Sequence, residues 1–308
     1  MEPNLGFILH THKNVPQVKR LVARIKGELP GSLVVVCHDR GGEPFEVTDG
    51  GRESDLEVRL VKGGRGDFSQ VTAYLDACKF LLSHPSHVSW IVNLTGQCYP
   101  LCRLDRFRNQ LASDSFDVWA EIFPVRSRDS PWPLREAVRR YHFRYFDLPD
   151  RSWSRLAVRS LDVLNRLQPV LAVEKRYRPA LGVRRPTIFS SSLACYGGSA
   201  YRVMNRRATE YLLRFCVQRP DVLAYFESTL APDESLVQSV LASNGSLRIR
   251  REPLHYFDFS TGRKSGSPKV LTMRDLPQIR ASGRFFGRKF DCEVDRDILD
   301  TLDAQARL

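Results

Sequence analysis

Short apolar runs alternate with amphipathic helical patterns through the first 125 residues of this 308-residue chain. Strand-type runs are expected at 6–11, 32–38, 56–61, 88–94 and 116–123, and helical spacing at 16–29 and 69–83. Alternation of this kind predicts parallel strands joined by right-handed crossovers. We therefore expect an α/β fold with a Rossmann-like mixed sheet flanked by helices.

Residues 134–180 break this alternation. Arginine and aromatic side chains interleave there, most densely over 139–146, and helical spacing follows over 153–167. This composition predicts two helices and a loop that pack on the sheet. Because no internal repeat or linker is visible, residues 1–308 are expected to form a single domain with this helical insert.

The chain is strongly basic, with a formal net charge of +12 that comes from 38 Arg and 9 Lys against 35 acidic residues. Such a charge favours an anionic partner: nucleic acid, anionic lipid or a phosphorylated small molecule. Basic residues interleaved with aromatic ones, as in 134–180, can bind single-stranded nucleic acid. They also occur on amphipathic helices whose Arg stems cover apolar surface, and this second interpretation is favoured here.

Cysteine usage and hydropathy indicate the compartment. The seven cysteines are sparsely spaced and lie mostly in apolar patterns, which is typical of reduced thiols in a cytoplasmic protein. No apolar run approaches the roughly 18 residues of a membrane span. The N-terminal segment lacks a basic region followed by a long apolar stretch, so we expect neither a signal peptide nor an anchor.

Several common catalytic motifs are missing. The sequence contains no P-loop, no G-x-G-x-x-G after the first strand and no G-x-S-x-G. The one D-x-D, Asp295-Arg296-Asp297, fits the acidic first turn of a last helix over 295–302. The cysteines lack zinc-finger spacing. No metal or cofactor is therefore indicated by these residues.

Three short segments carry candidate functional side chains. His12 and Asp39 follow the first two strands, where ligands bind in open parallel sheets. Glu234 lies in Pro-Asp-Glu at an expected helix start, where the dipole favours an ionised carboxylate that serves either as a general base or as a simple cap. The basic pairs Arg263-Lys264 and Arg288-Lys289 lie in Gly-containing segments that suit phosphate or are solvated surface charge.

Taken in order, six motifs from about residue 5 to residue 300 resemble the core-2/I-branching β-1,6-N-acetylglucosaminyltransferase family, which includes peptide O-xylosyltransferases. They are His12-Lys13, Val36-Cys-His-Asp39, Trp90-Ile-Val-Asn-Leu-Thr-Gly-Gln-Cys-Tyr-Pro-Leu101, Gly198-Ser-Ala-Tyr201, Pro232-Asp-Glu234 and Phe286-Gly-Arg-Lys-Phe-Asp291. Each motif alone is weakly specific. Their common order along the chain is what carries the resemblance.

The resemblance implies a GT-A-type fold and an inverting, metal-independent transfer of a sugar from a UDP-sugar to an acceptor hydroxyl. It implies Glu234 as the catalytic base. It also implies that fixed cations replace a metal at the diphosphate. The nucleotide-sugar contacts that it implies are His12, Asp39, Arg263, Lys264, Arg288 and Lys289, and the acceptor contacts that it implies are Glu121 and Tyr256.

This sequence departs from the family pattern at several places. Cys98 stands where the family has Asp, Thr95 stands where it has Ser, and the upstream diphosphate arginine aligns with Ser265, beside Arg263 and Lys264. The acceptor, a glycan or a small molecule, is not carried over, because 134–180 matches no family motif. N-acetylglucosamine is the family's commonest donor sugar and xylose is the alternative. A bacterial cytoplasmic enzyme is expected. A nucleic-acid-binding module and a non-catalytic nucleotide-sugar-binding protein remain alternatives.

Overall fold

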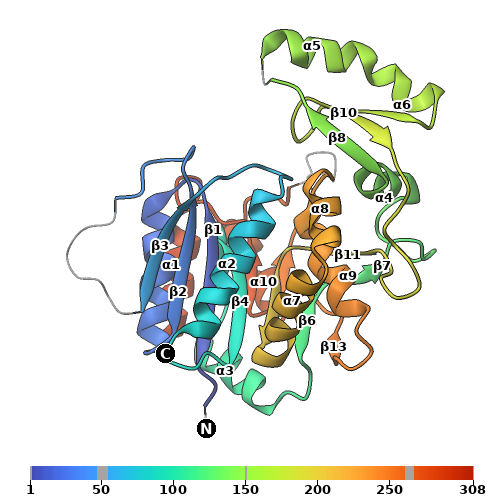
Figure 1. Ribbon diagram of the computed structural model, residues 1–308. Helices are drawn as coiled ribbons and strands as arrows, with labels where there is room; N and C mark the ends of the chain where they lie inside the picture. The colour runs from blue at the N-terminus through green and yellow to red at the C-terminus, as the bar shows by residue number, and fades with distance from the viewer. Residues whose placement is uncertain (1, 47–54, 150, 261–266, 308) are drawn as a thin grey trace.

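A computed structural model describes residues 2–46, 55–149, 151–260 and 267–307. Its largest element is a seven-stranded sheet with the strand order β13-β6-β12-β4-β1-β2-β3 (Figure 1). The strands are β1 Leu5–Thr11, β2 Leu33–Asp39, β3 Leu56–Val61, β4 Trp90–Thr95, β6 Val118–Ala120, β12 Arg202–Asn205 and β13 Ile249–Arg250. β12 is antiparallel to both of its neighbours, and the other pairs are parallel. The expected Rossmann-like mixed sheet is confirmed.

Helices cover both faces of this sheet, as expected. They are α1 Val15–Glu28, α2 Ser69–Ser83, α3 Leu104–Ser113, α7 Arg206–Gln218, α8 Pro220–Glu227, α9 Leu236–Ala242, α10 Leu276–Ala281 and α11 Asp297–Ala306. In β1, Phe7 and Leu9 belong to the hydrophobic cluster that includes α1, α3, α10 and α11, whereas Ile8 belongs to the cluster that includes α2, α7, α8 and α9. Burial on both faces explains why the strands are continuous apolar runs.

Smaller elements bring the C-terminal part of the chain to the carboxyl end of β4. A three-stranded sheet joins β5 Cys98–Pro100, β15 Phe286–Arg288 and β14 His255–Phe257. Within it Arg288 pairs with Cys98, directly after β4. A two-stranded sheet joins β7 Phe123–Pro124 and β11 Tyr196–Gly197, and the short 3-10 helices are η2 Pro232–Glu234 and η4 Met273–Asp275.

The insert, which we now define as residues 134–184, differs from the expectation of two helices and a loop. Its elements are α4 Leu134–Tyr141, β8 Phe143–Asp147, α5 Ser152–Ser160, η1 Leu161–Val163, α6 Leu164–Leu167, β9 Leu171–Glu174 and β10 Ala180–Arg184. The helices are present, but β8, β10 and β9 form an additional antiparallel sheet. The period-two alternation of β8 was obscured by the neighbouring Arg and aromatic run. Tyr141 packs in the main core, whereas the rest of the insert projects beyond the main sheet (Figure 1).

Two further boundaries differ from the expectation. The strand expected over 116–123 is divided into β6 and β7. The helix expected to begin at Pro232 begins at Leu236 instead, and η2 precedes it. Ala231 adopts a left-handed conformation with φ 47°, and Pro232 follows it, so the chain makes a tight turn that carries Glu234.

Candidate functional site

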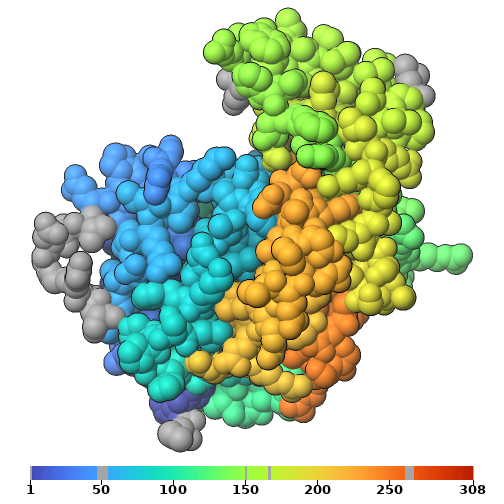
Figure 2. All heavy atoms as spheres, in the orientation of Figure 1, coloured from blue at the N-terminus to red at the C-terminus, as the bar shows by residue number. Residues whose placement is uncertain are grey.

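A cleft of about 890 Å³ lies at the carboxyl ends of β1, β2 and β4. Thr11, Asp39 and Thr95, the last residues of these strands, all line it. Residues of the insert line its other side, and the space-filling view shows the insert rising above the body of the molecule next to α8 (Figure 2). The cleft therefore lies at the edge of the sheet where the sequence predicts ligand binding.

His12 and Asp39, two of the expected nucleotide-sugar contacts, both line the cleft. The Asp39 carboxylate accepts hydrogen bonds from the backbone N–H groups of Gly41 at 2.9 Å and Gly63 at 3.1 Å. A side chain at Gly63 would place its Cβ 2.0 Å from Asp39 Oδ2, so this approach requires glycine. Burial and then the nearby Lys13 lower the pKa of His12, which keeps its imidazole neutral at pH 7.

Arg288 lies on β15 and lines the same cleft. Its guanidinium donates a hydrogen bond to the Thr95 hydroxyl and lies 5.4 Å from the centre of the Tyr201 ring. Cys98 Sγ accepts a 3.4 Å hydrogen bond from the Thr95 N–H. Cys98 is also the residue that pairs with Arg288 across β5 and β15.

Lys289 lies next to Arg288 and among other cations, although it does not line the cleft itself. Burial and then the charges of Arg288 and Lys13 lower its pKa. Lys13 pairs with Asp291 at 3.0 Å, and both Lys13 and Arg65 line the cleft. Such crowding of positive charge is relieved when an anion binds. Arg263 and Lys264 lie outside the described residues, while Ser267, shortly after them, lines the cleft.

Glu234 lies in the cleft and makes an ion pair that its sequence context does not indicate. Its Oε2 accepts a 2.5 Å hydrogen bond from Nη1 of Arg140, on helix α4 of the insert. The Arg140 side chain is 7% exposed and that of Glu234 is 35% exposed. Arg140 also donates from Nε to Glu136 at 2.8 Å. A buried arginine shared by two carboxylates fixes the Glu234 side chain at the edge of the cleft.

Asp233, which also lines the cleft, has unusual surroundings. Its Oδ1 is buried and has no hydrogen-bond partner among the described residues. Burial and then the charge of Glu234 raise its pKa to about 7, against the favourable charge of Arg202. Perturbed carboxylates of this kind are common at functional sites. From its sequence context Asp233 is only part of an expected helix start, because its burial depends on residues that are distant in the chain.

Of the two expected acceptor contacts, Glu121 lines the cleft and Tyr256 does not. Glu121 directly follows β6, and its carbonyl oxygen would lie 1.8 Å from a Cβ at position 198, so the chain needs glycine there. Gly198 in turn donates its N–H to the Glu234 carbonyl at 3.0 Å. Tyr256 is instead partly buried and packs against the hydrophobic cluster to which α10 and α11 contribute. Its neighbour Phe257 lines the cleft.

Aromatic side chains that the sequence analysis did not single out surround Arg140. Its guanidinium lies 4.5 Å from the centre of the Trp132 ring and 5.9 Å from that of Tyr177. Both rings line the cleft, as does Arg176. The interleaved Arg and aromatic residues of 134–180 were the sequence signal that could have indicated these contacts. Arg140, Arg176 and Tyr177 of that segment do line the cleft.

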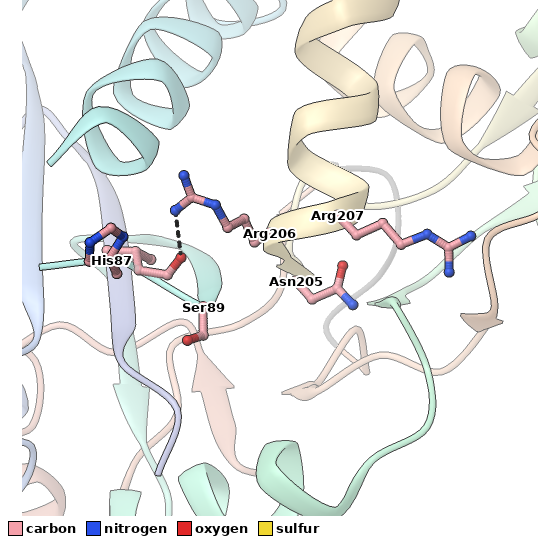
Figure 3. Close-up of a pocket in the computed structure, with 6 residues that line it drawn as sticks. His87, Ser89, Asn205, Arg206 and Arg207 are labelled. Atoms are coloured by element: carbon pink, nitrogen blue, oxygen red, sulfur yellow. Dashed lines mark hydrogen bonds between the residues drawn. The ribbon is translucent and has the colours of Figure 1, made fainter. Parts of the chain in front are cut away.

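A second hollow, of about 420 Å³, lies beside the start of β4 and the end of β12 (Figure 3). It is lined by His87, Val88, Ser89, Asn205, Arg206 and Arg207. Arg206 donates to the carbonyls of Val88 and Leu82, and Arg207 lies 3.6 Å from Asp117. Both arginines already have partners within the protein, so we assign this hollow a structural role and not a binding role.

Comparison with known proteins adds little to this geometry. No protein-family model and no curated protein sequence matches the chain. One solved structure that it resembles is a Bacillus anthracis protein described as a candidate glucose-1-phosphate thymidylyltransferase, in complex with sucrose. The two are 9% identical, the match covers 80% of this chain and 85% of that one, and the TM-score is 0.38. A likeness this weak transfers no activity.

Within the described ranges, no three His, Cys, Asp or Glu side chains gather as a metal site would require. The metal independence that the family resemblance implies stays a prediction, because it concerns the protein with a UDP-sugar bound. In the same ranges, every helix is too short or too polar to cross a bilayer.

Proposed function

We propose that this protein is an inverting, metal-independent glycosyltransferase that uses a UDP-sugar donor. The observation that supports it most is the placement of two chemically different groups in one cleft. A carboxylate, Glu234, is fixed by Arg140 at one side, and the cation Arg288 lies at the ends of the strands with Lys13 and Arg65. Tyr201, whose ring centre lies 5.4 Å from the Arg288 guanidinium, also lines this cleft.

The proposed chemistry follows from this arrangement. Glu234 Oε1, which has no hydrogen-bond partner among the described residues, takes the proton from the acceptor hydroxyl. The acceptor oxygen forms a bond to the anomeric carbon from the face opposite the diphosphate. The bond from that carbon to the phosphate oxygen breaks, and its electron pair leaves with UDP. Arg288 and Lys289 stabilise the charge that develops on the leaving diphosphate.

The donor end of the cleft suits a nucleoside. Neutral His12 can hydrogen-bond a base, and Asp39, held by two N–H groups, can accept from a ribose hydroxyl. N-acetylglucosamine is the proposed sugar and xylose the alternative. A non-catalytic nucleotide-sugar-binding protein would also use these contacts, but it would have no need of Glu234.

A thermal-shift screen tests the donor half of this proposal. UDP, GDP and TDP sugars are added with and without EDTA, and the melting temperature is compared with that of the protein alone. We expect stabilisation by UDP-sugars that EDTA leaves unchanged, because binding to the folded state raises stability. Stabilisation that disappears with EDTA and returns with Mn²⁺ would contradict the replacement of a metal by Arg288 and Lys289.

A further inference from the structure

Exposed apolar side chains are concentrated in the insert. The described residues contain 15 large hydrophobic side chains that are exposed, and ten of these belong to residues 134–184. They are Leu134, Phe146, Trp153, Leu156, Leu161, Val163, Val170, Leu171, Leu181 and Val183. Single exposed hydrophobic residues are ordinary, but a concentration in one-sixth of the chain marks an interaction surface.

Four of these side chains form one patch on the sheet of the insert. Phe146 lies directly opposite Leu181, and Val183 lies directly opposite Leu171. Leu181 and Val183 are two residues apart in β10, so all four side chains lie on the same face. The other face is buried with Leu230 of the main body through residues such as Tyr145. The outward face of this small sheet is therefore apolar and exposed.

Helix α5 adds a second exposed apolar edge. Trp153 is 56% exposed and Leu156 is 65% exposed, and a spacing of three residues places them on one side of the helix. Arg155 and Arg159, four residues apart, lie along another side, and both are exposed. Val158 is buried and attaches the helix to the insert. Arginine on one edge with Trp and Leu on the other is the pattern of helices that lie in a membrane interface.

The charge of the insert indicates what covers these surfaces. Residues 134–184 contain 12 Lys and Arg and five Asp and Glu, a net charge of +7 out of +12 for the chain. A second copy of this surface would be repelled by the like charge. Eight of the ten exposed side chains are Leu or Val. These do not stack on bases, which disfavours single-stranded nucleic acid. A partner that is anionic and also accepts aliphatic side chains is a membrane with anionic phospholipids.

We propose that the insert docks the protein onto an anionic phospholipid surface. Trp153, Leu156 and the Phe146–Leu181 patch enter the interfacial region, and arginines such as Arg144 and Arg159 contact the headgroups. Tyr177 lines the cleft and packs with the inward face of the insert sheet, so the cleft and the proposed lipid surface lie on different sides of that sheet. This proposal goes beyond the proposed transferase activity and does not depend on it.

Vesicle sedimentation tests the proposal with the whole protein. Vesicles of phosphatidylcholine alone are compared with vesicles of equal parts phosphatidylcholine and phosphatidylglycerol. The test variants are Trp153→Ser/Leu156→Ser and Arg144→Gln/Arg159→Gln. The control is Arg214→Gln/Val217→Ser, on helix α7 of the main body. It changes one exposed arginine and one apolar residue, Val217, that is 76% exposed.

We expect binding to the anionic vesicles only. The apolar variant should lower the partition coefficient by at least about tenfold. Each arginine removed should lower it about fivefold. The control should bind like the wild type. Brominated lipids should quench the part of the wild-type fluorescence that comes from Trp153, and this quenching should be missing in Trp153→Ser/Leu156→Ser. Equal binding by all variants, or binding to single-stranded DNA in place of vesicles, or dimerisation through the insert, would each overturn the proposal.

Discussion

Arg140 of the insert donates a 2.5 Å hydrogen bond to Glu234 in the 3-10 turn before α9, and this contact joins the insert to the cleft. The two residues are 94 positions apart in the chain. The Arg140 side chain is buried, its guanidinium lies over the Trp132 ring, and it donates a second hydrogen bond to Glu136. The position of the proposed base therefore depends on the insert.

Replacing Arg140 should damage both activity and stability. Arg140→Gln leaves Glu136 and Glu234 without their shared cation, so we expect the free energy of unfolding to fall by about 2 kcal/mol. The proposed transfer should fall more than UDP binding does, because the donor contacts lie elsewhere. Urea denaturation measures the stability, and the rate of UDP release from the donor, compared with UDP titration, separates transfer from binding. Arg144→Gln, an exposed arginine of the same insert, is the control, and an equal loss in both variants would contradict the role of the ion pair.

Asp233 should make stability depend on pH. Its pKa is raised from 3.8 to about 7 in the folded protein, so the folded state binds the proton more tightly than the unfolded state does. The stability that this proton contributes is complete below about pH 4 and is lost as the pH rises through about 7. Asp233→Asn should remove this component. Melting temperatures of both proteins across this range measure it, and parallel curves would show that Asp233 is not the group concerned.

Gly63 should be required for donor binding. A Cβ at this position would lie 2.0 Å from Asp39 Oδ2, so Gly63→Ala must displace the Asp39 carboxylate or the loop. We expect weaker binding of UDP, measured by calorimetry. Gly27→Ala is the matched control, since nothing lies within 4 Å of a Cβ there and alanine favours the helix by up to about 1 kcal/mol. Unchanged UDP affinity in Gly63→Ala would remove Asp39 from the proposed site.

Lys289 should contribute to diphosphate binding although it lies beside the cleft. Lys289→Gln removes one charge-assisted contact, so UDP affinity should fall by about 10- to 100-fold. The affinity for uridine, which has no phosphate, should stay the same. Lys79→Gln, on the exposed surface of α2, serves as the control. An equal loss for UDP and uridine would point to a general disturbance of the fold.

Much of the sheet and its helices could be predicted from local patterns. The bounds of β3, Leu56–Val61, and α2, Ser69–Ser83, agree with the expectation, because both have clear periodicity. His12, Asp39 and Glu234, which the sequence motifs single out, all line one cleft, and their roles stay predictions.

Other features depend on contacts that no local pattern contains. The raised pKa of Asp233 and the partner of Glu234 arise only when distant segments meet. The three strands of the insert were missed because Arg and aromatic residues suit an amphipathic helix and a half-exposed strand equally well. Whether Arg263 or Lys264 reaches the diphosphate stays a prediction, since both lie outside the described residues.

The most direct test of the account is the rate of UDP release from UDP-N-acetylglucosamine or UDP-xylose by Glu234→Gln, with water or an added glycan as acceptor. Glu227→Gln, an exposed glutamate at the end of α8, is the control. We predict a fall of about 100- to 10,000-fold in Glu234→Gln with UDP binding unchanged. Release at the wild-type rate by Glu234→Gln, with UDP still bound, would contradict the assignment of Glu234 as the base.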